Sequence, residues 1–434
     1  MIFNVLFLAI FMEKVTKIGG SLNTMLNEPL DEKSLEFYID TLTTRSTDIV
    51  SQIGELKAAC MSPNDSNSHL LLGHRGCGKS TELNKLIQEL KSEDYPIHKI
   101  KCLEEIDMYN IDRNDILLLI SSALIEISIK NEIQIPLPLT KSIFDFFKET
   151  EITVEEESKE GINAEAGVSA NIGNFAFSPL KLFFKVKGEI KYGTSKRKII
   201  REKLQNNVGE WLQNINELKD IIYNKKQKLP ILIFEDIDKI PDPKDALTVF
   251  NNSILANLQF PVVFTFPISV AFSGEFTPIR NQYNVHFLPM IKTHDQNNND
   301  YIKGINKIKE IIYARAEKSL FEDEAITLLI KKTGGILREV FRCINKAAYR
   351  AYKRGSDIVE KEDIERALME LQSDYRRALV TIGGEENLIK IYETKKAISD
   401  IEMLKYLHAQ IVLEYNGETW FDVHPLVYDF VKIS

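Results

Sequence analysis

A chain of 434 residues is long enough to form two or three domains. Its composition, 44% hydrophobic and 27% charged, is that of an ordinary soluble globular protein. The net charge of −8 disfavours a protein that coats nucleic acid over its whole surface, although a local basic patch remains compatible with it. The four cysteines are too scattered for a C-x-x-C metal or redox pair and are typical of free thiols in a reducing cytoplasm: Cys60, Cys77, Cys102 and Cys343.

Residues 1–11 form an apolar run that is too short to span a bilayer and that lacks the preceding positive charge of a secretory signal. Met12-Glu13-Lys14 is a second candidate start. We interpret 1–20 as an upstream mis-start or a disordered extension, with a short membrane-associating tail as the alternative. No other stretch is apolar enough to cross a membrane, and we expect a cytoplasmic protein.

A strand, a glycine-rich loop and a helix follow one another near the start of the first domain. A helical lead-in over about 21–61 and a polar turn at 64–67 precede the apolar strand predicted at 68–72. Apolar residues recur at helical spacing over 83–90. Between strand and helix stands a complete G-x-x-x-x-G-K-[ST] motif: Gly73-His74-Arg75-Gly76-Cys77-Gly78-Lys79-Ser80-Thr81.

This motif predicts a phosphate-binding loop, and the alternative is a chance glycine-rich turn before a surface helix. The glycines allow a tight turn whose N–H groups face phosphate oxygens. The helix that begins near Lys79 adds free N–H groups and the positive end of its dipole. Lys79 is expected to reach the β- and γ-phosphates, and the Ser80 hydroxyl is expected to bind Mg²⁺. Cys77 is either a small filler in the loop or a thiol whose oxidation would inactivate it.

A strand at 97–103 and a helix at 112–129 precede an unusual charged insertion at about 140–198. Its first half, 149–165, is acidic, and a glycine- and phenylalanine-bearing stretch at 170–179 is expected to be β or irregular. The basic half, 181–203, carries nine Lys/Arg against Glu189 and Glu202. We interpret the insertion as a solvated arm whose halves attract each other, with a sensor or partner-docking arm as the alternative. A long helix over 200–222 follows.

The second chemical landmark is an apolar strand that ends in acids, Ile231-Leu232-Ile233-Phe234-Glu235-Asp236-Ile237-Asp238. Ligands of a parallel sheet bind at the carboxyl ends of its strands, so acids there can meet Mg²⁺ and the attacking water. Alone this pattern is common, but downstream of an intact phosphate loop it is a strong signal.

The remaining sheet and the helical regions follow. We predict a helix at 245–258, strands at 261–266 and 285–288, and a polar loop at 294–300. All-helical patterns then continue to about Leu407, with a break at Thr333-Gly334-Gly335 and a short helix at 361–368. Strands at 410–415 and 419–423, joined by the hairpin turn Asn416-Gly417, and a final helix near Pro425 suggest a small winged-helix-like unit.

Together these segments resemble the AAA+ and STAND classes of ATPases. The helical segments at 308–315, 333–339 and 358–363 are similar to the lid of the origin-recognition and clamp-loader branch. Leu288-Pro289-Met290, the late charged helix, 411–415 and 423–426 resemble bacterial AAA-family ATP-binding proteins of unassigned role. The resemblance implies an ATP- and Mg²⁺-dependent ATPase. It also implies that Arg338, in a G-x-x-R pattern with Gly335, reaches the γ-phosphate; the alternative is a lid salt bridge.

The resemblance implies further roles. Glu235 stands where the class has Asp, which leaves the assignment of the acids open; we expect Glu235 at Mg²⁺, Asp236 orienting the attacking water, and Asp238 behind them. Thr265 is either a polar sensor or a strand-end threonine that caps its neighbour. Arg280 is either a finger for the ATP of a neighbouring subunit or a surface arginine.

The sequence thus predicts an α/β P-loop NTPase of AAA+-like architecture. We place an N-terminal extension at 1–20, the ATPase core at 21–300, a helical lid at 301–374 and a winged-helix-like segment at 375–434. The expected partners are ATP and a second copy or a protein partner. DNA is not favoured, because the end segment carries seven Lys/Arg against nine Asp/Glu, a net of −2. A non-hydrolysing nucleotide-binding scaffold is a further alternative.

Overall fold

The computed structural model describes residues 14–18, 29–45, 52–62, 67–148, 179–192, 195–398, 400–415 and 419–431. The predictions for the apolar run at 1–11, most of the turn at 64–67, the acidic segment, the stretch at 170–178 and the Asn416-Gly417 turn lie outside these ranges. Within them, no helix combines the length and the apolar character needed to cross a membrane.

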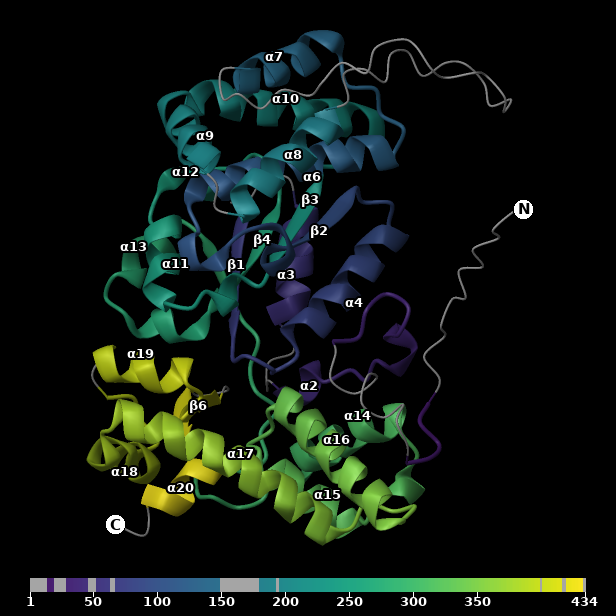
Figure 1. Ribbon diagram of the computed structural model, residues 1–434, viewed down its shortest axis with the longest axis vertical. Helices are drawn as coiled ribbons and strands as arrows, with labels where there is room; N and C mark the ends of the chain where they lie inside the picture. The colour runs from purple at the N-terminus through teal and green to yellow at the C-terminus, as the bar shows by residue number, and fades with distance from the viewer. Residues whose placement is uncertain are drawn as a thin grey trace.

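A five-stranded parallel sheet forms the centre of the molecule, with strand order β2-β3-β4-β1-β5 (Figure 1). Its strands are β1 (Ser68–Gly73), β2 (Ile97–Lys101), β3 (Ile231–Glu235), β4 (Val262–Pro267) and β5 (Asn284–Phe287). The three central strands are buried along their whole length, as expected of parallel strands covered on both faces.

Alternate residues of these strands face two separate hydrophobic cores. Leu71, Ile233 and Val263 face α3 (Gln52–Met61) and α4 (Lys79–Ser92). Leu72, Phe234 and Phe264 face a larger core. Helices that supply residues to this larger core include α6 (Arg113–Lys130), α7 (Leu137–Lys148), α8 (Pro179–Lys191), α9 (Ser195–Asn206), α10 (Val208–Lys226), α11 (Pro243–Phe250), α12 (Ser253–Ala256) and α13 (Phe276–Arg280).

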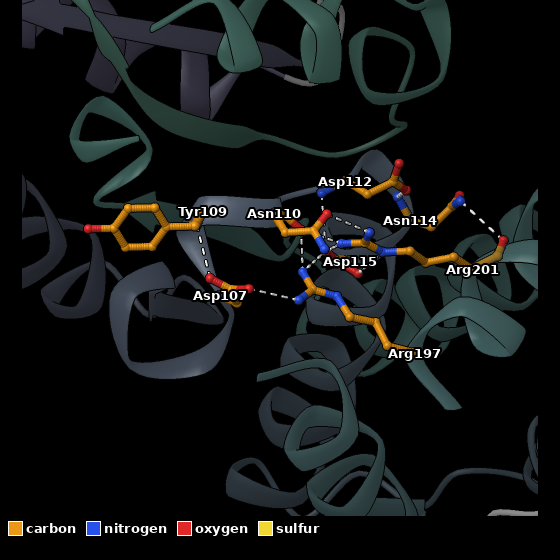
Figure 2. Close-up of polar contacts among 8 residues, drawn as sticks. All are labelled: Asp107, Tyr109, Asn110, Asp112, Asn114, Asp115, Arg197 and Arg201. Carbon is orange, nitrogen blue, oxygen red and sulfur yellow. Dashed lines mark hydrogen bonds and ion pairs between the residues drawn. The ribbon is translucent and has the colours of Figure 1, made fainter. Parts of the chain in front are cut away.

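The basic half of the insertion is helical and packed, which corrects the expectation of a solvated arm for the part that the structure describes. Val186, Ile190 and Ile200 are fully buried in the larger core. Two arginines of α9 converge on the fully buried Asp115 of α6: Arg197 Nη2 lies 3.1 Å from Oδ2, and Arg201 Nε lies 3.0 Å from Oδ1 (Figure 2).

Asp115 also belongs to the capping box of α6, because it accepts the N–H of Asp112 at 3.1 Å (Figure 2). Arg197 in addition pairs with Asp107 at 3.1 Å. Burying a carboxylate requires such complete pairing, so Arg197 and Arg201 hold this helix to the sheet domain rather than face water.

The lid and the C-terminal segment lie together in the lower half of Figure 1, and their buried apolar residues form one hydrophobic core. The lid helices are α14 (Ile302–Arg315), α15 (Asp323–Lys332), α16 (Leu337–Arg354) and α17 (Lys361–Ile382). The C-terminal elements are α18 (Glu385–Thr394), α19 (Asp400–His408), β6 (Val412–Tyr415), β7 (Trp420–Val423) and α20 (Pro425–Val431), with β6 and β7 antiparallel. The predicted combination of an α/β P-loop core, a helical lid and a short winged-helix-like segment is confirmed.

Several boundaries differ from the prediction. The strand at 97–103 ends at Lys101, and a turn of helix, α5 (Cys102–Glu105), follows. The helix at 245–258 is divided between α11 and α12, and the helix at 200–222 is divided at Asn207. The helix predicted at 361–368 continues as α17 to Ile382, so the predicted border between 374 and 375 falls inside it. The remaining helix, α2 (Leu42–Arg45), lies in the lead-in.

Candidate functional site

The loop between β1 and α4 is shaped by glycines. Gly76 and Gly78 have φ of 81° and 109°, a backbone conformation in which L side chains are strained. A Cβ on Gly76 would lie 2.6 Å from the Cβ of Arg338, so the loop also needs glycine to let the lid helix approach. The backbone N–H of Arg338 donates to the carbonyl of Gly76 at 3.2 Å. The start of α16 therefore lies directly on the phosphate loop.

Lys79, the first residue of α4, is buried with its ammonium inside this loop. It donates to the carbonyls of Gly73 at 2.8 Å and His74 at 3.0 Å, and it pairs with Asp238 at 2.9 Å. Burial works to raise the pKa of the Asp238 carboxyl, but the nearby Lys79 charge leaves that pKa below its ordinary value. The sequence placed Asp238 behind the other acids; the structure places it on the loop lysine.

The other two acids at the end of β3 have different surroundings. Glu235 is buried, with Lys99 Nζ 3.4 Å away, and Ser80 lies beside it. Burial raises the pKa of Glu235, although Lys99 and the contact with Ser80 oppose that rise. Asp236 pairs with Lys239 at 2.6 Å and has φ of 76°. Such a conformation at a non-glycine residue is uncommon and is found disproportionately at functional sites.

The residues present fit a magnesium ion at the Ser80–Glu235 side of the loop. The Oε1 atom of Glu235 is buried and has no hydrogen-bond partner among the described residues. A carboxylate oxygen and a hydroxyl are the hard oxygen donors that Mg²⁺ uses together with phosphate oxygens and water. A bound cation would satisfy the Glu235 oxygen and remove the cost of burying it.

A pocket of about 240 Å³ lies over the loop, between the sheet and the lid. Its cationic lining residues are Arg75, Lys79, Lys239, Arg315 and Arg338, and Asp238 is its acidic one. Thr265 of β4 also lines it, and its proximity to Asp238 helps to lower the pKa of that carboxyl. These lining residues give the partly buried pocket a net excess of four positive charges, which suits the binding of a polyanion.

Arg45, Arg315 and Gln410 were not singled out by the sequence. Arg45 is buried and donates to the carbonyls of Cys77 at 2.8 Å and Pro289 at 2.6 Å, so the lead-in clamps the phosphate loop. Arg315 ends α14 and packs 4.4 Å from the ring centroid of Phe341, and burial lowers its pKa to about 10. An arginine at a helix end is too ordinary a pattern to reveal either role.

The C-terminal hairpin is attached to the loop through His74. The N–H of Glu414 in β6 donates to His74 Nε2 at 2.8 Å. Burial and the neighbouring Lys79 lower the pKa of His74 to about 3, so its imidazole is neutral and can accept this bond at ordinary pH. His74 is thus a bridge between the loop and the end segment.

The structure brings most of the predicted site residues together. The pocket is lined by Arg75, Gly76, Gly78, Lys79, Ser80, Thr81, Thr265 and Arg338. Cys77 is buried behind the loop. Arg280 is exposed at the end of α13 and does not line the pocket. Its predicted role, which requires a second copy of the chain, stays a prediction.

No protein-family model matches the chain, and no curated protein matches it. Solved structures do. ORC2 of Aeropyrum pernix is 12% identical, with 93% of this chain and 98% of that chain covered and a TM-score of 0.42. The Walker-type ATPase PABY2304 of Pyrococcus abyssi is 13% identical, with 92% and 99% covered and a TM-score of 0.43. Cdc6p of Pyrobaculum aerophilum is 12% identical, with 91% and 98% covered and a TM-score of 0.38. What this chain binds is inferred from its own residues, which form a parallel α/β sheet with a phosphate-loop sequence and a helical lid.

Proposed function

We propose that this protein binds ATP with Mg²⁺ in the pocket over the Gly73–Thr81 loop and hydrolyses it. The observation that carries the proposal is the convergence on Lys79. A complete phosphate-loop sequence, a buried ammonium, Asp238 just after β3 and the lid arginine Arg338 meet at one pocket. A chance glycine-rich turn gives no reason for a buried lysine to pair with Asp238, a buried acid more than 150 residues away in the sequence.

Each residue has a defined part in an in-line attack of water on the γ-phosphate. Lys79 and Arg338 bind the phosphate oxygens and balance the charge that develops on them. Asp238 holds Lys79 in the loop, and Asp236 orients the attacking water. Glu235 and Ser80 would hold Mg²⁺, and the bound ion would neutralise part of the phosphate charge. The lid arginine leaves its contact when the γ-phosphate departs, so hydrolysis can change the position of the lid.

A phosphate-release assay tests the proposal. The native chain with ATP and Mg²⁺ is expected to release phosphate steadily, and excess EDTA is expected to stop the release, because the metal neutralises the reacting phosphates. ATP binding without phosphate release would support the alternative of a non-hydrolysing nucleotide-binding scaffold. The observation in favour of that alternative is that Glu235 stands where the ATPase class has Asp. Failure to bind ATP would refute both.

We propose that ATP hydrolysis operates a conformational and assembly switch. The lid and the end segment share one core and both contact the phosphate loop, so a change at the nucleotide reaches both. A switch of this kind would act with a second copy or a protein partner, as in bacterial signalling or defence. Arg280, exposed and outside the pocket, is available to a neighbouring subunit.

An initiator-like DNA-binding ATPase is the second candidate, because the end segment has a winged-helix-like order of elements. Its net charge of −2 gives it few phosphate contacts, and affinity for DNA depends largely on such contacts. We expect a titration with duplex DNA to show weak binding with a shallow dependence on salt. Tight binding that weakens steeply with salt would instead support the initiator-like function.

A further inference from the structure

The turn that follows α19 contains a residue in an unusual conformation. Gln410 has φ of 58°, and it occupies the left-handed position after the helix end. The N–H of Gln410 donates to the carbonyl of Leu407, and the N–H of Ile411 donates to that of Tyr406, the pattern of a Schellman motif. Glycine is the usual residue at this position because it has no steric conflict there. A glutamine that accepts this conformation points to a role for its side chain.

The Gln410 side chain joins three segments that are far apart in the sequence. Its Nε2 donates to the carbonyl of Arg75 in the phosphate loop at 2.7 Å. Its Oε1 accepts from Nη2 of Arg338, at the start of lid helix α16, at 2.7 Å. Gln410 is 6% exposed, so both bonds are shielded from water. Both of its partners, Arg75 and Arg338, line the nucleotide pocket.

The chemistry of an amide suits this place better than that of an acid. A glutamine fixes one N–H of the guanidinium but is neutral, so the positive charge of Arg338 remains available to a phosphate. A carboxylate would orient the arginine equally well, but it would neutralise its charge and could not donate to the Arg75 carbonyl. An amide is thus the group that both orients the arginine and bonds to the loop without removing the charge.

We propose that Gln410 is a positioning residue for Arg338 and thereby sets the preference of the site for a nucleoside triphosphate over a diphosphate. The proposal rests on the proposed function of the pocket. Gln410 belongs to the C-terminal segment, so that segment completes the site that senses the γ-phosphate. The bond from the Glu414 N–H to His74 is a second attachment of the same segment to the adjacent loop residue.

The test is a thermodynamic cycle on the full-length protein, with affinities for a non-hydrolysable ATP analogue and for ADP measured by calorimetry in the presence of Mg²⁺. The variants are Gln410→Glu, which keeps the shape, and Gln410→Gly, which keeps the turn. Each variant is expected to weaken binding of the triphosphate about tenfold, because the charge-assisted contact between Arg338 and the γ-phosphate is lost. The affinity for ADP, which has no γ-phosphate, is expected to stay within about twofold of the native value. Gln372→Ala, which removes a part-buried glutamine of α17 that contacts Asp429, is the matched control and is expected to change neither affinity.

The decisive comparison is made in the Arg338→Ala background. If Gln410 acts through Arg338, adding either change to Arg338→Ala weakens triphosphate binding no further. The proposal is overturned if the changes at Gln410 weaken both nucleotides equally, or if their effect is as large without Arg338 as with it. A native chain that binds neither nucleotide would refute the proposed function instead.

Discussion

Replacing Lys79 by alanine is expected to weaken ATP binding about a hundredfold and to reduce phosphate release below detection. Lys79 is buried, 5% exposed, and its ammonium is held by two loop carbonyls at the edge of the pocket. Losing a buried cationic contact to a phosphate group removes about 3 kcal/mol, which corresponds to roughly two powers of ten in affinity. Calorimetry with Mg²⁺ and ATP, together with the phosphate-release assay, measures both effects.

Loss of the lysine has a second consequence that must be separated from the first. Asp238 would remain buried without its counter-ion, and a carboxylate in that state can destabilise the fold by about 3–5 kcal/mol. The double variant Lys79→Ala/Asp238→Asn removes this charge, so it should regain most of the thermal stability while ATP binding stays lost. Lys85→Ala, on the same helix but partly exposed, should bind ATP as the native chain does. If the double variant bound ATP normally, Lys79 would have a purely structural role.

The phosphate loop and the sheet could be predicted because their signals are local. A glycine–lysine–serine spacing, continuous apolar strands and acids at a strand end are each defined within ten residues. The parallel sheet was predicted from these signals, whereas the lid was predicted from the resemblance of 308–315, 333–339 and 358–363 to a known lid, and the end segment from its order of helices and hairpin. The proximity of Ser80 to Glu235 and of Thr265 to Asp238 then agrees with the rule that parallel strands present their carboxyl ends at one edge.

The contacts that complete the site could not be predicted in this way, because each joins segments that only the tertiary fold brings together. Gln410 is an ordinary glutamine in the sequence; its role appears only when its backbone conformation and its two partners are seen. The prediction of a solvated arm was wrong for the basic helix at 195–206 for a related reason. A run of charges usually faces water, and nothing in the sequence shows that Asp115 lies buried opposite Arg197 and Arg201 (Figure 2).

Glu235→Gln and Asp236→Asn are expected to impair hydrolysis in different ways. If Glu235 holds the metal, its replacement raises the Mg²⁺ concentration for half-maximal activity about 10–100-fold, which is the range seen when groups that support a metal are lost. If Asp236 orients the attacking water, its replacement lowers kcat by about 10²–10⁴-fold and leaves the Mg²⁺ requirement unchanged. Magnesium titrations of phosphate release at saturating ATP separate the two. The reverse pattern would exchange the two assignments.

The pH dependence gives an independent check on Glu235. Burial raises the pKa of its carboxyl above the ordinary value, so a proton occupies it at a higher pH than it would an exposed glutamate. Only the ionised form binds Mg²⁺, and the Mg²⁺ requirement of the native chain should therefore rise as the pH falls toward that raised pKa. In Glu235→Gln this acid-side increase should disappear, because the amide does not titrate in that range. Lys99→Met would remove the positive charge that opposes the rise and should move the increase to higher pH. An acid-side increase that is equally large in the native chain and in Glu235→Gln would exclude Glu235 as the metal-holding acid.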